Sequence, residues 1–300
     1  MEKAVVIVGP TAVGKTSLAV KIAKEFDGAL LSADSVQVFK TLDIISGKDK
    51  EEISDISAFL LDVVSPFESF SVSQFENLAK ESIVSIISSN KLPVIVGGTG
   101  LYVKSIVDGI DTALVKPDQK LRDLLDKLSV QDLQKRLNAL DKDLFGSLND
   151  SDRMNKRRLI RKIEILKNRK KVDVGAKKRN LEFLQIGLEL SREDIKKNID
   201  VRVDERIKNG GLDEVRNLFN DYDDLTPQVK DANGYKQLFE HFLGVTSLDE
   251  AILKWKLSEY KHAKNQMTWF KKDTRIKWFL ADRRDLFESI KMDIDTFLKG

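Results

Sequence analysis

The 300-residue sequence contains no cysteine and only two histidines, and each shortage excludes certain kinds of cross-link or metal site. Without thiols it can form neither disulfides nor thiolate-ligated metal sites, and we expect a reducing, cytoplasmic setting. His241 and His262 are too few and too far apart for a histidine metal cluster. No apolar run approaches the roughly 20 residues of a membrane-spanning helix, so we expect no membrane partner. The N-terminal apolar run is short and reads as a buried strand rather than a signal sequence.

The sequence also lacks a large net charge, because 51 basic residues nearly balance 48 acidic ones and leave +3. The charge is unevenly distributed, however. Residues 151–180 contain 13 Lys/Arg against 3 Asp/Glu, a local charge of +10, so the remainder carries about −7. A basic segment on a mildly acidic chain predicts a polyanionic partner. A solvated helix face is the alternative interpretation.

Residues 9–16 match the phosphate-binding pattern G-x-x-x-x-G-K-[ST], and the apolar run 4–8 leads directly into them. A helical pattern follows at 17–23, so the segment predicts a strand, a P-loop and a helix. Such a loop surrounds phosphates with backbone N–H groups, a lysine and the positive end of a helix dipole. We therefore expect a diphosphate site that includes Gly9, Thr11, Ala12, Val13, Gly14, Lys15 and Thr16.

Further apolar runs alternate with helical patterns, which predicts a parallel sheet with helices packed against it. The predicted strands cover 4–8, 29–33, 59–64, 92–96, 184–188 and 276–280. A helix is expected over 72–87, another carries Ile199, Val203 and Ile207 and ends at Gly210-Gly211, and helices extend to Phe270. The expected fold class is α/β, with a P-loop NTPase-like parallel sheet and an inserted all-helical module.

The strand signal disappears between Pro117 and Arg179, where charged amphipathic helices such as 121–128 and 159–166 replace it. This change predicts two domains. Residues 1–112 and 180–300 form the P-loop-type α/β core with C-terminal helices, and residues 113–179 form a basic helical insertion.

Motifs spread over almost the whole chain resemble the tRNA dimethylallyltransferase family; they lie at 9–16, 32–37, 97–102, 155–164, 234–236 and 266–270. Asp-Ser-x-Gln at 34–37 and Gly-Gly-Thr-Gly-Leu-Tyr at 97–102 are more specific than the P-loop. The resemblance implies transfer of the dimethylallyl group of dimethylallyl diphosphate to the exocyclic N6 amine of the adenine adjacent to the anticodon in tRNA, with release of diphosphate.

The residues suit that chemistry. A departing diphosphate gathers negative charge, which Mg²⁺ and cationic side chains would stabilise. Lys15 and the metal-ligating Thr16 fit those roles. The attacking amine must lose a proton, and Asp34 is the candidate base, although a turn-forming aspartate is the simpler alternative. The resemblance places Arg202 on the diphosphate, whereas Arg206 is as easily a surface arginine paired with an acid.

The resemblance also implies contacts with the anticodon stem-loop of tRNA. The predicted residues are Asp34, Ser35, Val36, Gln37, Thr99, Arg157, Arg158, Leu159, Ile160 and Arg161. Closely spaced arginines on a helix can bind successive phosphates. Ser35 and Gln37 either read the adenine or bond to backbone, and Thr99 either contacts tRNA or caps a turn. Trp269 is expected to anchor its helix to the core, and His262 to be structural.

Three alternatives remain open. A small-molecule P-loop kinase would use Asp62 on a strand as an ATP-magnesium ligand. An adenylate isopentenyltransferase would act on free nucleotide, and a nucleotide-binding RNA-interaction protein would lack catalysis. The chain departs from the family at 45–48, where Ile-Ser-Gly-Lys replaces Gly-Thr-Ala-Lys, and at Asn198 and Asn265, where arginines are common. We expect a monomer.

Overall fold

The computed structural model describes residues 2–109, 118–168 and 181–300. The chain divides into two compact units, a core unit of residues 1–109 with 180–300 and an insertion unit of residues 110–179. The domain boundaries expected at 112/113 and 179/180 lie outside the described residues.

One parallel six-stranded sheet organises the core unit. Its strands are β1 (Glu2–Val8), β2 (Gly28–Ser32), β3 (Ala58–Phe59), β4 (Leu92–Val96), β5 (Leu181–Glu189) and β6 (Lys277–Leu280). The spatial order is β3-β2-β4-β1-β5-β6. Ala4 to Val8 of β1 are fully buried, which explains why the central strand is a continuous apolar run. The predicted fold class is confirmed.

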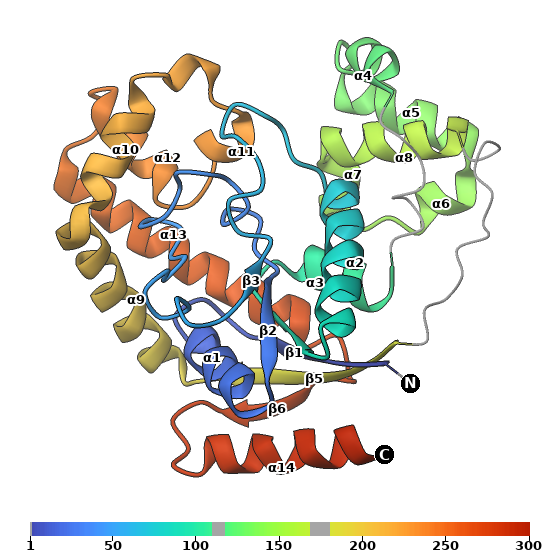
Figure 1. The fold of residues 1–300 in the computed structure, drawn as a ribbon. Helices are drawn as coiled ribbons and strands as arrows, with labels where there is room; N and C mark the ends of the chain where they lie inside the picture. Colours follow the sequence, from blue (N-terminus) through green and yellow to red (C-terminus); the bar gives the residue numbers. More distant parts are fainter. Residues whose placement is uncertain (1, 110–117, 169–180) are drawn as a thin grey trace. The chain divides into compact units, whose positions relative to one another are not determined.

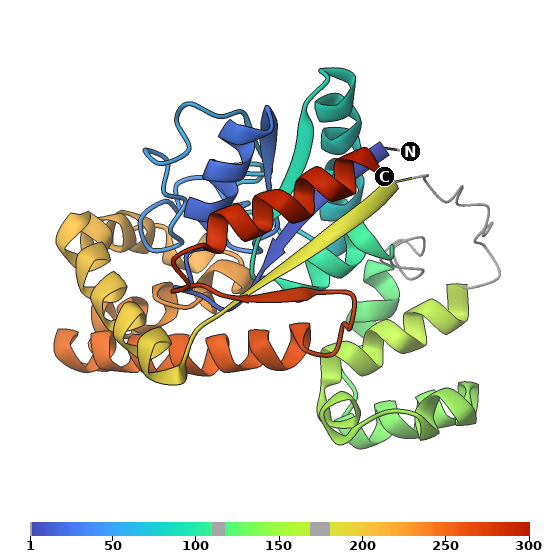
Figure 2. The same cartoon turned by 90° about the horizontal axis from the view of Figure 1, so that it is seen from below.

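Helices cover the sheet and extend beyond one of its edges (Figure 1). Those of the core unit are α1 (Lys15–Glu25), α2 (Val72–Ser88), α3 (Gly100–Val107), α9 (Arg192–Arg206), α10 (Leu212–Phe219), α11 (Pro227–Lys230), α12 (Tyr235–Phe242), α13 (Leu248–Phe270) and α14 (Leu286–Lys299). The long helix α13 packs against α9 and α12, and its last turns reach α3. Figure 2 shows α14 crossing β5 on the face seen from below.

The sheet order brings the three sequence motifs together. β2, β4 and β1 are neighbours, and the P-loop follows β1, Asp34 follows β2 and Gly97 follows β4. Because parallel strands end at the same edge, the three loops share the crevice in which open α/β sheets bind their ligands.

The predicted strand at 59–64 is wrong beyond Phe59. Leu60 and Asp62 both adopt left-handed backbone angles, with φ of 63° and 55°, and these break the extended chain. The turn directs the Asp62 carboxylate to Lys48, 2.5 Å away, and to Lys50, 3.0 Å away. Lys48 is buried and also contacts Asp43 at 2.7 Å, so this charge cluster holds the segment away from the sheet.

The other predicted elements of the core are present, with shifted ends. The helix carrying Ile199 and Val203 ends at Arg206 and continues through an irregular turn in which Gly210 has φ 96°. β5 and β6 cover the runs expected near 184–188 and 276–280, and α13 ends at Phe270. None of the described helices is long and apolar enough to cross a membrane.

The described part of the insertion unit contains five helices: α4 (Gln119–Leu125), α5 (Val130–Leu140), α6 (Lys142–Gly146), α7 (Asp150–Met154) and α8 (Lys156–Asn168). Asp118, Ser129, Asp141 and Asn149 cap the first four through side-chain oxygens, as short polar residues do at helix starts. The unit has its own core, in which the buried Glu164 binds Arg122 at 2.8 Å.

Candidate active site

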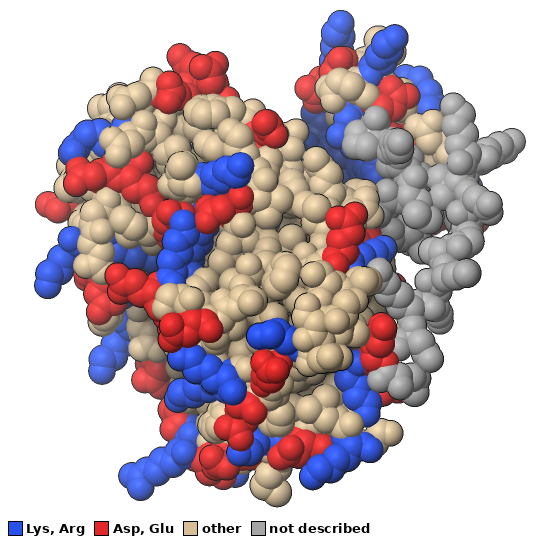
Figure 3. All heavy atoms as spheres, viewed as in Figure 1, with Lys and Arg blue, Asp and Glu red and all other residues tan. Residues whose placement is uncertain are grey.

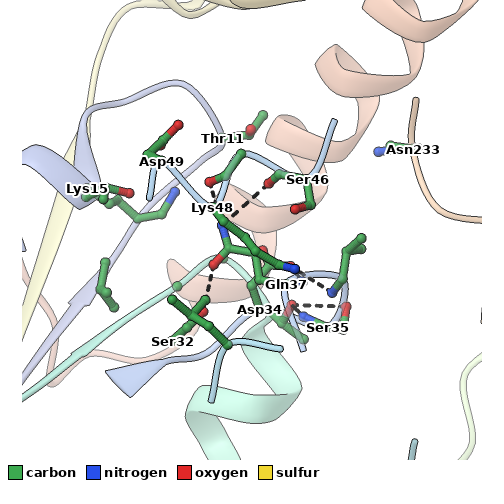
Figure 4. Close-up of a pocket in the computed structure, with 18 of the residues that line it drawn as sticks. Thr11, Lys15, Ser32, Asp34, Ser35, Gln37, Ser46, Lys48, Asp49 and Asn233 are labelled. Atoms are coloured by element: carbon green, nitrogen blue, oxygen red, sulfur yellow. Dashed lines mark hydrogen bonds between the residues drawn. The ribbon is translucent and has the colours of Figure 1, made fainter. Parts of the chain in front are cut away.

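A cavity of about 430 Å³ lies in the core unit at the carboxyl edge of the sheet. The P-loop, the loops after β2 and β4, the segment 45–49, and helices α9 and α13 line it. In Figure 3, uncharged side chains occupy the centre of the visible face, and acidic and basic side chains are interspersed around them. Figure 4 shows Lys15, Thr11, Asp34, Ser35, Gln37 and Asp49 gathered around the cavity.

The lysine of the P-loop bends back on its own loop. Its Nζ donates to the Pro10 carbonyl at 2.7 Å, and among the described residues it forms no ion pair. Burial, together with the nearby Arg202, lowers the pKa of Lys15 to about 7. A buried lysine in this state gains strongly from an anion, because the anion restores the charged form.

Two arginines of α9 complete the cationic side of the cavity. The Arg202 guanidinium donates to the Thr11 hydroxyl and lies 3.9 Å from Glu259 of α13. Arg206 is buried, and its Nη1 donates to the Ile45 carbonyl at 2.7 Å. Burial, together with the neighbouring Arg202, lowers the pKa of Arg206 to about 10. The alternative that Arg206 is a paired surface arginine is therefore wrong.

The departure from the family at 45–48 accommodates this buried arginine. A Cβ on Gly47 would lie 1.8 Å from Arg206 Nη2, so only glycine allows the guanidinium to approach the loop so closely. On the other side, the Glu214 carboxylate accepts from the backbone N–H groups of residues 43, 44 and 45 at 2.8, 2.6 and 3.1 Å. Arg206 at the end of α9 and Glu214 of α10 thus hold the segment 43–47 in place.

Asp34 forms an aspartate turn and also lines the cavity. Its Oδ1 accepts from Val36 N at 2.8 Å and Gln37 N at 3.3 Å, the geometry of an aspartate turn. Among the described residues, Oδ2 accepts no hydrogen bond, and the side chain lines the cavity. The turn therefore orients the carboxylate and leaves one oxygen for a ligand.

The other polar residues of the loop after β2 form their hydrogen bonds mainly with other residues of the protein. Gln37 accepts from Ser32 Oγ at 2.7 Å and donates to the Gly47 carbonyl at 2.7 Å, so both ends of its amide are engaged. The Thr99 hydroxyl accepts from Ser35 N at 3.0 Å and makes no hydrogen bond that caps its own helix. Thr99 thus joins the loop after β4 to the loop after β2, and Val36 packs against the core.

Helix α13 supplies a contact that the sequence motifs did not assign. The buried Gln266 accepts from Thr11 N at 2.7 Å and donates to the Gly98 carbonyl at 3.0 Å. One side chain therefore connects the P-loop with the loop after β4. Asn198 of α9 likewise donates to the Ala12 carbonyl at 3.1 Å, so this departure from the family holds the P-loop backbone rather than adding charge.

The residues at the P-loop fit a magnesium ion that a diphosphate would share. Thr16 offers a hydroxyl at the start of α1, and the described residues contain no cluster of three or more His, Asp or Glu that could hold a metal alone. Mg²⁺ at phosphate sites takes few protein ligands and completes its shell with phosphate oxygens and water. Thr16 is therefore a suitable single protein ligand.

The predicted tRNA contacts of the insertion unit divide into two groups. Leu159 and Ile160 are buried in that unit's own core, so their side chains pack the insertion and are not presented to RNA. Arg157 and Arg158 are exposed, with Arg158 2.5 Å from Asp152, and Arg161 is half-buried beside Glu164. Of these five residues, only the arginines remain candidates for side-chain contacts with RNA, and the basic residues within 169–180 lie outside the described part.

Two expectations for α13 are also corrected. Trp269 is 45% exposed, and the anchoring role belongs to its neighbour Phe270, which is 3% exposed. The reason is geometric: consecutive helix residues point about 100° apart, so only one of the two can face the core. His262 is exposed and lines the cavity, so it is not simply a packing residue.

Comparisons with known proteins agree on one family. A family model described as IPP transferase matches residues 37–273, and one described as isopentenyl transferase matches residues 2–63. The chain is 38% identical to the tRNA dimethylallyltransferase of Thermoanaerobacter sp. (strain X514), over 99% of this chain and 97% of the relative. It is also 38% identical to that of Finegoldia magna, over 97% and 95% of the two chains.

Solved structures give the same result. The tRNA isopentenylpyrophosphate transferase of Bacillus halodurans superposes with a TM-score of 0.73 at 34% identity, covering 100% of this chain and 96% of the other. A eukaryotic dimethylallyltransferase acting on tRNA superposes with a TM-score of 0.81 at 25% identity, covering 97% and 78%.

The contact between Gln266 and the P-loop gives a testable expectation. Gln266→Met keeps the side-chain volume but leaves the Thr11 N–H and Gly98 carbonyl unpaired, and each buried unpaired group costs about 1–3 kcal/mol. We expect pyrophosphate binding, measured calorimetrically with Mg²⁺, to weaken by about tenfold or more because the loop is no longer held. Asn265→Ala, next to it on the same helix and outside the cavity lining, serves as the control. Unchanged pyrophosphate affinity in Gln266→Met would contradict the positioning role.

Proposed function

The chain belongs to the tRNA dimethylallyltransferase family, and from this premise we infer that it is a prenyltransferase that transfers a dimethylallyl group to adenine in tRNA. We propose that the acceptor atom is the exocyclic N6 amine of the adenine adjacent to the anticodon, and that diphosphate is released. The cavity at the carboxyl edge of the sheet is the proposed site of the reaction.

The observation that carries this proposal is the group of cations around the P-loop. The pKa of Lys15 is lowered to about 7 and that of Arg206 to about 10, in both cases by burial and then by Arg202. Charges that repel one another in a buried site favour a polyanionic ligand, and the diphosphate of the prenyl donor is one. Their charge also stabilises the leaving group as the bond to it breaks.

The reaction needs two events at one carbon of the donor, the allylic carbon that carries the diphosphate. The allylic C–O bond breaks, and its electron pair leaves with the diphosphate, which Lys15 and Arg202 hold. The adenine N6 lone pair forms the new C–N bond. The proton that N6 then releases passes to Asp34 Oδ2, the oxygen that accepts no hydrogen bond within the described chain.

Thr16 would hold the magnesium ion, which when bound supplies charge neutralisation of the diphosphate and orients it. The protein residues contribute the rest. The Thr11 hydroxyl orients Arg202, and Gln266 fixes the loop backbone beneath the diphosphate. Ser35 and Thr99 hold the loop that carries Asp34.

We propose that the tRNA is bound in part by Arg157, Arg158 and Arg161 of α8, through phosphate contacts along the anticodon stem-loop. An adenine inside a stacked loop cannot reach Asp34, so it must leave the stack and enter the cavity. Because tRNA is the substrate, we place the reaction in the cytoplasm, and we propose that one chain is sufficient for it.

The structure favours this reading over a P-loop kinase. The kinase alternative requires Asp62 as a magnesium ligand, but Asp62 pairs with Lys48 and Lys50 and does not line the cavity. An enzyme that transfers the group to free adenylate would use the same donor site. The two functions are therefore distinguished by the acceptor that is modified.

The proposed function is tested by incubating the protein with labelled dimethylallyl diphosphate and Mg²⁺, with tRNA, AMP or ATP offered in parallel. Label should appear on tRNA, at N6 of the adenine next to the anticodon. Label on free nucleotide only would contradict the tRNA assignment and support the adenylate alternative.

The role of Asp34 is tested by comparing Asp34→Asn with Asp34→Ala. The asparagine can still accept from Val36 N and so preserves the turn, but it cannot take the proton. We expect both variants to lose about 10²–10⁴-fold in kcat, the usual size of a general-base contribution. Asp34→Asn should keep the wild-type melting temperature and pyrophosphate affinity. A turnover close to wild type in Asp34→Asn would remove Asp34 as the base.

A further inference from the structure

A second cavity lies on the core unit beside the reaction cavity, and the reaction described above does not use it. It has a volume of about 470 Å³ and is formed by α3, the last turn of α13 and the segment 272–276 that leads into β6. Both ribbon views show the end of α13 against α3, as their contacts require (Figures 1 and 2).

The exposed indole of Trp269 forms one wall of this second cavity. A Cβ on Gly100 would lie 2.2 and 2.3 Å from two indole ring atoms, so the ring rests directly on the backbone of α3. Within the described chain, the indole N–H donates no hydrogen bond. A tryptophan that is held in place along one edge yet partly open to solvent presents an aromatic surface on which a base can stack.

Acidic and basic side chains both line the second cavity, and two of its lysines are available to a ligand. Lys104 of α3 and Lys272 are exposed, and among the described residues neither forms an ion pair. Arg275, by contrast, is neutralised by Asp108 at 2.7 Å and Asp273 at 2.6 Å. The sequence from Lys261 to Lys272 contains four lysines and no acidic residue. An aromatic surface between unpaired cations is the usual composition of a single-stranded nucleic acid site.

The position of the second cavity relates it to the first. Gly98 and Thr99 line the reaction cavity, and Gly100 lines the second, so one short loop separates them. The Cα atoms of Gly98 and Gly100 are at most about 7 Å apart, because two residues of extended chain span no more. A nucleotide that adjoins a base in the reaction cavity is therefore within reach of the second cavity.

We propose that the second cavity is a subsite for an unpaired nucleotide that neighbours the target adenine, with its base stacked on Trp269 and its phosphates near Lys104 and Lys272. The inference rests on the proposed function, because it requires a single-stranded RNA loop as substrate. Stacking on an aromatic face tolerates any base, so the subsite holds the displaced strand rather than reading its sequence.

The proposal predicts a specific kinetic change. Trp269→Ala should raise KM for tRNA by about tenfold, the usual loss for one base–aromatic stack, and leave kcat and the KM for dimethylallyl diphosphate near wild type. Trp269→Phe keeps a stacking face and should recover most of the affinity. Leu257→Ala removes another exposed apolar side chain of α13, away from both cavities, and serves as the control.

A direct readout distinguishes stacking from a loss of local structure. With 5-fluorotryptophan in the full chain, the three tryptophans give three ¹⁹F signals, and Trp269→Phe assigns one of them. An anticodon stem-loop RNA should shift the Trp269 signal, whereas pyrophosphate with Mg²⁺ should not. The signal of Trp255, which is fully buried, should stay in place.

The outcomes separate the subsite from the proposed function. If wild-type protein modifies tRNA but Trp269→Ala keeps its KM for tRNA, or RNA leaves the Trp269 signal unmoved, the subsite is contradicted while the function stands. If wild-type protein does not modify tRNA at all, the function fails first. A shift of the Trp269 signal by polyglutamate and not by RNA would assign the surface to an acidic protein segment and overturn the proposal.

Discussion

The structure of the reaction cavity depends on three positive charges that lie close together at the P-loop. Lys15, Arg202 and Arg206 converge from α1 and α9, and burial lowers the pKa of Lys15 and Arg206. Such an arrangement is unfavourable in an empty protein, because desolvated like charges repel. Proteins retain such an arrangement where a ligand neutralises the charges, because functional sites commonly reduce the stability of the fold. We propose that the diphosphate of a prenyl donor neutralises them here, and that the same charges then assist its departure.

The surrounding fold holds these charges in place. The parallel sheet brings the P-loop, the Asp34 loop and the Gly97–Thr99 loop to one edge. Helix α13 then joins two of these loops through Gln266 and approaches Arg202 through Glu259. Glu214 fixes the backbone of residues 43–45, and this segment in turn receives Arg206. The charged groups are therefore held by contacts from several distant parts of the chain.

Much of this could be predicted from the sequence, because its local signals agree with the fold. The apolar run before Gly9 and the helical pattern after Thr16 identify a strand, a P-loop and a helix, and alternating strands and helices predict the parallel sheet. Gln266 was not assigned a role because it lies 255 residues from the P-loop residue that it contacts. The strand at 59–64 failed because the ion pairs of Asp62 with Lys48 and Lys50 override a purely apolar pattern. The prediction for Trp269 failed because the sequence does not show which of two adjacent aromatic residues on a helix faces the core.

The central claim is that the cations at the P-loop form a site for a diphosphate, and the titration of Lys15 tests it most directly. With isotope-labelled lysine, NMR should give Lys15 a pKa of about 7 in the free protein, well below the ordinary 10.5. Pyrophosphate with Mg²⁺ should raise this pKa toward the ordinary value, so at pH 8 binding should take up about one proton, and at pH 6 almost none. Lys15→Arg should abolish the uptake. An ordinary lysine pKa in the free protein, or no change when pyrophosphate binds, would contradict the account.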